Sequence, residues 1–164
     1  MNLIESFLFP LTLAAALSTG LVAGIFFAFS NFVMAALQRV QPSTGIASMQ
    51  AINVTVLNPL FFLFFLGAAL LSLVLCAFAL LRWQHSSSAW LLAGGVLYVA
   101  GSLLVTAAGN VPLNEKLAKL DPSSPESVSL WREYVSKWVV WNHVRTIASL
   151  LAATAFSVAL TRQA

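Results

Sequence analysis

Trp138-Val-Val-Trp-Asn-His-Val-Arg-Thr146 opens an apolar run that continues to Leu160 and would otherwise be an ordinary membrane span. Arg145 lies within the first turns of that run. An ionisable group inside a membrane segment is energetically costly, and it therefore indicates a functional site by default. The run predicts a final membrane helix that carries a polar site near its start.

Four residues of this run share one helical face because their spacing is i, i+3, i+4 and i+7: Trp138, Trp141, Asn142 and Arg145. Ser149, Ala152 and Ala153 extend the face as a strip of small residues, which suits close helix packing. We expect this face to point into a helix bundle. The alternative is that Arg145 reaches the headgroups while the tryptophans form an interfacial belt.

The composition is that of an integral membrane protein. Of the 164 residues, 60% are apolar and only 8% are charged, whereas a soluble domain carries about 25% charged residues. The net charge of +3 is small and resides in loops, so no nucleic-acid partner is expected. The first apolar run lacks a preceding basic segment and is expected to stay in the membrane. With Cys76 as the only cysteine, no internal disulfide can form.

The apolar runs predict one all-α domain over residues 1–164, an antiparallel four-helix membrane bundle. The expected spans cover about 7–37, 57–81, 89–108 and 138–160, with the last helix beginning near Pro125. Asn58 and Pro59 form a start signal for the second span, so capping is the favoured interpretation of Asn58. Glycine strips in the first and third spans, around Gly24 and Gly101, predict close helix contacts.

Two longer connectors lie on the same side of the membrane. The first, residues 41–56, places Ile46 and Met49 on one helical face, which predicts a short helix at the interface or over the bundle end. In the second, Gly109 is expected to end the third span and Pro112 to begin a short helix.

Polar residues gather at that same end of the bundle, which makes it the expected site for a small molecule. The candidates are Asn31, Asn58, Asn110, Asn114, Trp138, Trp141, Asn142, His143 and Arg145. For Asn31, a hydrogen bond to a neighbouring helix is an equally good interpretation. No metal site is expected, because His85 and His143 lie at opposite ends of the membrane and no pair of carboxylates faces a span.

Several segments together resemble the family of small membrane proteins that includes the anthrone oxygenases. They are Gly24-x-x-Phe-Ala-Phe-Ser30, Met49-Gln-x-Ile-Asn53, Asn58-Pro59, Asn110-Val-Pro-Leu-Asn114, Trp131 and Trp141-Asn-x-x-Arg-Thr146. The resemblance implies oxygen insertion into a hydrophobic anthrone to give an anthraquinone, without an obvious flavin or metal cofactor.

The resemblance also suggests roles for the candidate residues. Arg145, with Asn142 or Asn110, would stabilise an enolate oxygen, and His143 has the right pKa for a general base. On an ideal helix, however, His143 points about 140° away from Trp138. The substrate-binding candidates are Asn31, Asn58, Asn110, Asn114, Trp131, Trp138 and Trp141, which would line a wet mouth and stack on the rings.

Two alternatives to an enzyme remain: a non-catalytic protein that binds or passes a small hydrophobic molecule, and an oligomerising structural subunit. We expect the lipid bilayer as the environment, in the bacterial inner (plasma) membrane, and a homo-oligomer is one open arrangement. The connector side carries more cations than the other side, which by the positive-inside rule places the polar mouth in the cytoplasm. These cations are Arg39, Lys116, Lys119, Arg132 and Lys137, against Arg82 and Arg162.

Overall fold

The computed structural model describes residues 3–163, with side chains from Phe7 onward, and this part of the chain is almost entirely helical. Met1, Asn2 and Ala164, which the expected domain includes, lie outside the described residues. Helices long and apolar enough to cross a membrane are found at Phe7–Arg39, Pro59–Leu81, Ser88–Ala118 and Ser127–Thr161. These four segments confirm the predicted all-α architecture of a membrane protein.

Seven α-helices build these rods and one connector. The first rod joins α1 (Leu3–Ala28), a π-helical turn (Phe29–Val33) and α2 (Met34–Arg39). The connector helix is α3 (Pro42–Thr55), and the second rod is α4 (Pro59–Leu81). The third rod joins α5 (Ser88–Tyr98), two π-helical segments (Val99–Leu104 and Thr106–Asn110) and α6 (Val111–Ala118), and α7 (Ser127–Thr161) is the fourth.

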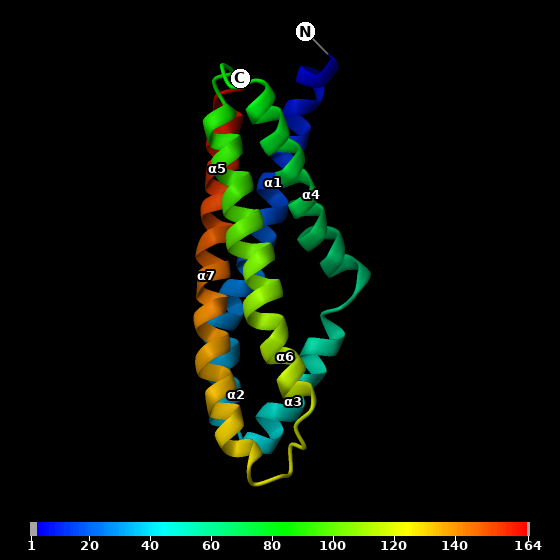
Figure 1. The fold of residues 1–164 in the computed structure, drawn as a ribbon, viewed down its shortest axis with the longest axis vertical. Helices are drawn as coiled ribbons and strands as arrows, with labels where there is room; N and C mark the ends of the chain where they lie inside the picture. The colour runs from blue at the N-terminus through cyan, green and yellow to red at the C-terminus, as the bar shows by residue number, and fades with distance from the viewer. Residues whose placement is uncertain (1–2, 164) are drawn as a thin grey trace.

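The four rods form a ring in which α1 packs against α4 and α7, and α5 packs against the same two helices. Successive rods run in opposite directions, so both ends of the chain lie at one end of the bundle, opposite α3 (Figure 1). This is the expected antiparallel four-helix bundle, with both longer connectors at the α3 end.

One predicted boundary was wrong: the third span does not end at Ala108. Asn110 and Val111 keep helical backbone angles, and no described residue has a positive φ, so Gly109 does not act as a terminator. The rod instead passes through its π-helical segments and continues to Ala118. Pro112 is tolerated because it occupies the first turn of α6, where a missing amide hydrogen costs little.

Glycines of the third rod bring it close to α7, as their strip predicted. A Cβ atom on Gly94 would lie 2.9 Å from the ring of Phe156, and one on Gly101 would overlap the Cβ of Ala148. In the first rod the prediction was wrong for Gly24, whose added Cβ would meet no atom within 4 Å. The glycine-mediated contacts of the third rod therefore lie against α7 at Gly94 and Gly101 and against α4 at Gly95.

Two apolar cores follow one another along the bundle axis. The larger core fills the end that holds the chain termini and includes Phe26, Phe65, Tyr98 and Phe156. The smaller core lies at the α3 end and contains Met34, Ile46, Met49, Leu117, Trp131, Tyr134, Val135 and Trp138. The connector helix α3 thus folds over the bundle end, one of the two arrangements predicted for it.

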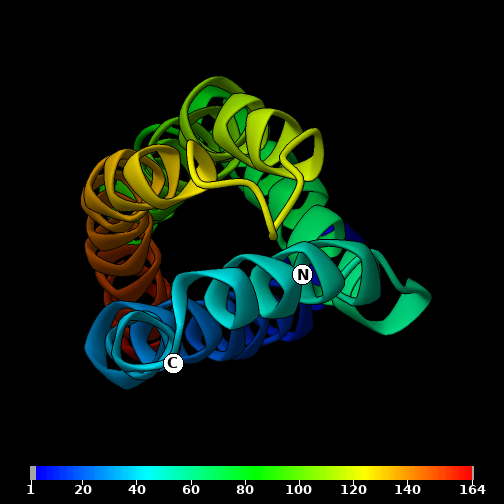
Figure 2. The same cartoon turned by 90° about the horizontal axis from the view of Figure 1, so that it is seen from below.

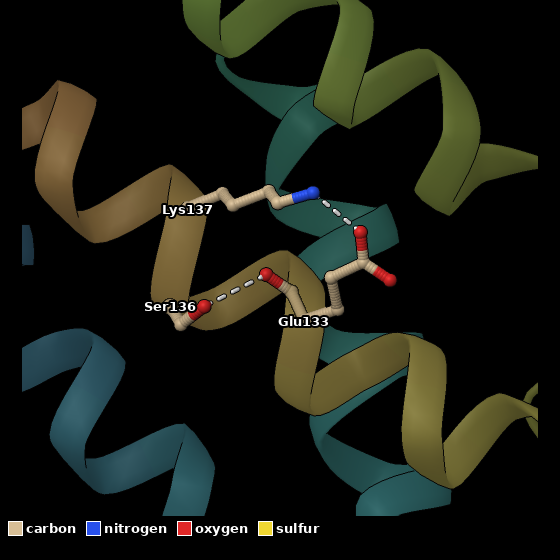
Figure 3. A network of polar contacts seen from close by, with 3 residues as sticks. All are labelled: Glu133, Ser136 and Lys137. Carbon is tan, nitrogen blue, oxygen red and sulfur yellow. Dashed lines mark hydrogen bonds and ion pairs between the residues drawn. The ribbon is translucent and has the colours of Figure 1, made fainter.

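Side-chain polar contacts at the α3 end are of two kinds. One kind joins α3 to the third rod, and the other lies on the exposed side of α7. The Gln50 side chain donates to the carbonyl oxygens of Leu117 (2.8 Å) and Leu120 (3.0 Å). On the exposed side of α7, Lys137 forms an ion pair with Glu133 at 2.5 Å, and Ser136 donates to the Glu133 carbonyl (Figure 3). Charged pairs of this kind indicate the part of α7 that meets water.

Candidate functional site

Arg145 is the centre of a polar layer between the two apolar cores, and its side chain is only 5% exposed. Its Nη2 donates to Oδ1 of Asn142 at 2.5 Å, and its Nη1 donates to Oγ1 of Thr106 at 3.2 Å. The guanidinium carbon lies 4.1 Å from the ring centroid of Phe26 and 5.3 Å from that of Trp138. The cation is therefore held between two aromatic rings, as cation–π contacts favour.

Among the side chains that the structure describes, residues 7–163, no carboxylate forms an ion pair with this buried cation. Its Nε is also buried without a hydrogen-bond acceptor. Burying a charge without a counter-charge costs several kcal/mol, and its neighbours recover that cost only in part. A group held in this way is suited to binding an anion, or an oxygen atom that becomes anionic.

Asn142 orients the guanidinium and joins α7 to the first rod. Its Nδ2 donates to the carbonyl oxygen of Phe26 and to Oγ of Ser30, both at 2.7 Å. With both amide hydrogens engaged there, the Asn142 oxygen faces Arg145. Thr146 donates to the Asn142 carbonyl at 2.8 Å and lies 3.2 Å from the Ser30 hydroxyl, which completes the network.

Asn110 and Asn114 fix Trp138 from the third rod. Asn110 donates to the Trp138 carbonyl at 3.1 Å, while its own Oδ1 is buried without a partner. Oδ1 of Asn114 accepts from Nε1 of Trp138 at 2.8 Å and from the Tyr134 hydroxyl at 2.9 Å. Trp138 therefore presents a fixed ring beneath Arg145, and the layer leaves one donor and one acceptor free for a ligand.

π-Helical turns flank the layer on both sides. The turn Phe29–Val33 carries Ser30, and the segment Thr106–Asn110 carries the residues that contact Arg145 and Trp138. Such turns insert an extra residue into a helix and occur frequently at functional sites. Here they carry Ser30, which contacts Asn142, and Thr106, which contacts the guanidinium.

The position of Arg145 along α7 can be compared with the thickness of a bilayer. At about 1.5 Å per residue, Arg145 is about 25 Å along α7 from Arg162, which lies at the end that holds the chain termini. The hydrocarbon core of a bilayer is about 30 Å thick. With Arg162 at one boundary, Arg145 would lie about one turn inside the other, at the α3 end.

The structure brings Asn110, Asn142 and Arg145 together with Trp138, as the sequence predicted. Asn114 joins them through Trp138, and Trp131 stacks on Tyr134 one layer below, with ring centroids 5.6 Å apart. The mouth predicted at this end is covered by α3 and the smaller core. The layer is enclosed rather than facing water.

Four predicted residues lie away from the layer. Asn31 is exposed, and so is His143, with no hydrogen bond from its ring. Asn58 caps α4 by accepting from the Phe61 amide at 3.0 Å, as its favoured interpretation required. Trp141 is 43% exposed and packs over Gly109 in the π-helical segment Thr106–Asn110. His143 points away from the stripe, as its helical angle indicated.

Sequence reasoning missed Phe26, Ser30 and Thr106, although each contacts Asn142 or Arg145. A signal existed for the first two, since Phe26 and Ser30 are four residues apart and share a helical face. Thr106 carried no such signal, because the π-helical segment changes the angular spacing of the third rod.

A comparison with known families adds an independent assignment. The family model described as anthrone oxygenase matches residues 60–155, more than half of the chain. The chain belongs to the anthrone oxygenase family. No curated protein and no solved structure matches it. The matched segment of this family member contains Thr106, Asn110, Asn142 and Arg145, whereas Phe26 and Ser30 precede it.

Proposed function

We propose that the protein is a membrane-embedded oxygenase-like enzyme that acts on a flat hydrophobic ketone of the anthrone class. The observation that carries this proposal is the buried Arg145 guanidinium, which has aromatic rings beside it and no carboxylate partner among the described residues. Membership of the anthrone oxygenase family supports the same class of reaction.

An anthrone has one acidic methylene group opposite its ketone. When that methylene loses a proton, the negative charge moves largely to the ketone oxygen, and this is the charge that Arg145 would stabilise. The electron-rich carbon then reduces dioxygen and forms a carbon–oxygen bond, giving a hydroperoxide. Loss of the second methylene hydrogen with cleavage of the O–O bond leaves a new carbonyl and releases water. One oxygen atom of dioxygen therefore enters the product, and the other becomes water.

The described neighbours of Arg145 stabilise charge and do not accept a proton. They are amide, hydroxyl and aromatic groups, and His143 is exposed on another face of α7. The cluster therefore promotes ionisation by lowering the pKa of the bound substrate. Because no neighbour takes the proton, it must leave the enclosed layer to reach solvent. The oxidation rate should accordingly rise with pH, because a larger fraction of the substrate is then ionised.

The test is turnover in proteoliposomes. Emodin anthrone is added under oxygen, and quinone absorbance and oxygen uptake are followed for wild-type protein, Arg145→Gln and empty vesicles. The proposal expects a wild-type rate well above that of vesicles and an Arg145→Gln rate close to it. Equal rates in all three would refute the enzyme. Ligand-induced thermal stabilisation that depends on Arg145 without turnover would instead identify a non-catalytic binding protein.

A further inference from the structure

The polar layer around Arg145 is closed to water from both ends of the bundle. Towards the chain termini it is covered by the larger core, including the fully buried Tyr98 and Phe156. At the other end it is covered by Trp131, Met49 and the rest of the smaller core beneath α3. A ligand that reaches the guanidinium must therefore pass through the side wall of the ring.

The first turns of α4 stand apart from the third rod below them. The helix packs mainly against α1 and α5 rather than α6, and its ribbon leans away from α6 towards its start (Figures 1 and 2). The Asn58 side chain bonds only within its own segment, to the Thr55 carbonyl and the Phe61 amide. Leu60 and Leu63 are both 65% exposed, as expected of residues that face lipid.

A row of aromatic rings leads from this surface to the guanidinium. The half-exposed Phe62 lies 6.1 Å from Phe61, measured between ring centroids, and Phe61 stacks on Phe65 at 5.3 Å with planes 13° apart. Phe65 meets Phe26 edge-on at 6.2 Å, and the Arg145 guanidinium lies over Phe26. The partly buried Phe61 is thus the first ring beneath the exposed surface, and the buried rings of Phe65 and Phe26 lie between it and the guanidinium.

We propose that a flat aromatic ligand enters from the bilayer beside the first turns of α4 and takes the place of the Phe61 ring on Phe65. Because a tricyclic ligand is longer than one phenyl ring, a ligand stacked on Phe65 would extend beyond it towards Phe26 and the Arg145 guanidinium. The ligand class rests on the proposed function, while the entry route and the binding position on Phe65 rest on the geometry above. Phe61 is then a positioning and gating residue rather than a catalytic one.

The test uses 9,10-anthraquinone, which has no methylene group and cannot be turned over. It is mixed with the full-length protein in phosphatidylcholine vesicles, and association is followed by stopped-flow quenching of tryptophan fluorescence. Phe61→Ala should associate at least about fivefold faster than wild type, because the ring no longer has to be displaced. Phe61→Trp should associate more slowly.

Two control variants distinguish entry through the side wall from entry at the α3 end. Phe64→Ala removes a partly buried ring of α4 that is not part of the aromatic row. Gln50→Ala removes the side-chain hydrogen bonds that hold α3 at the aqueous end. Both should remain within about twofold of wild type. Faster association in Gln50→Ala but not in Phe61→Ala would overturn the route, as would wild-type protein that shows no quenching. Phe61→Leu replaces Phe61→Ala if the latter does not fold.

The outcome is independent of turnover. A gating effect of Phe61 without oxidation of emodin anthrone would refute the proposed enzyme and retain the entry route. Turnover together with equal association in all variants would refute the route alone.

Discussion

Replacing Arg145 by methionine separates a role in function from a role in folding. The substitution keeps a side chain of similar length but removes the charge, both hydrogen bonds and the cation–π contacts. A guanidinium retained for stability would cause a large loss of folding free energy when removed. A guanidinium retained to bind an anion would cause a small one.

The magnitude follows from the contacts. Hydrogen bonds to a charged group contribute about 1.5–3 kcal/mol each, and a desolvated cation–π contact contributes about 2 kcal/mol. Against these stands a desolvation penalty of several kcal/mol per buried ion. The opposing contributions nearly cancel, so Arg145→Met should change the unfolding free energy by less than about 2 kcal/mol. Trp138→Ala, which empties a packed and hydrogen-bonded position, should cost about 3–5 kcal/mol.

Arg145→Met should have a small effect on stability but a large effect on the oxidation rate. Loss of one preorganised donor to an oxyanion lowers the rate by about 10²–10³-fold, so Arg145→Met should lose at least that factor in emodin anthrone oxidation. The assay pairs thermal unfolding in detergent with oxygen uptake in proteoliposomes. A variant destabilised as strongly as Trp138→Ala, or one that retains the wild-type rate, would refute the reasoning.

Other substitutions test single contacts and their surroundings. Gly95→Ala should destabilise the protein by about 1–3 kcal/mol, because the new Cβ would overlap Sγ of Cys76, whereas Gly24→Ala has open space and should be neutral or slightly stabilising in thermal unfolding. His143→Gln should leave the oxidation rate within about twofold of wild type, since the ring is exposed; a loss of about 10²-fold would restore it as a base. Gln50→Ala should speed hydrogen exchange in α3, because two bonds to the third rod are lost, and unchanged exchange would show that the smaller core alone holds this helix. The oxidation rate of wild-type protein should rise from about pH 6 to 8, as ionisation of the substrate requires; a falling rate would contradict solvent as the proton acceptor.

Much of the fold followed from patterns that the chain carries locally. Long apolar runs gave the four rods, and the start signal at Asn58 and Pro59 was read correctly because capping depends only on adjacent residues. The end of the third span was missed because Gly109 is a usual signal of a helix end, whereas the π-helical segment keeps the chain helical through it. Pro112 lies in the first turn of α6, as expected of a residue that begins a helix.

The candidate site was predictable where one helix supplied it. Trp138, Asn142 and Arg145 share a face of α7 by helical spacing alone, and all are buried. Asn31 was placed wrongly because an ideal helix was assumed, whereas the turn Phe29–Val33 is π-helical and presents Ser30 to Asn142 instead. That the layer is enclosed depends on how α3 folds over the bundle end, which local spacing does not determine.

The central claim is that Arg145 holds the ionised form of the substrate, and an anaerobic titration tests it most directly. Emodin anthrone is added to wild-type protein and to Arg145→Gln without oxygen, at a pH where the free compound is neutral, and its absorption spectrum is recorded. The account predicts the spectrum of the enolate with wild-type protein and that of the neutral compound with Arg145→Gln. Identical spectra with the two proteins would contradict it.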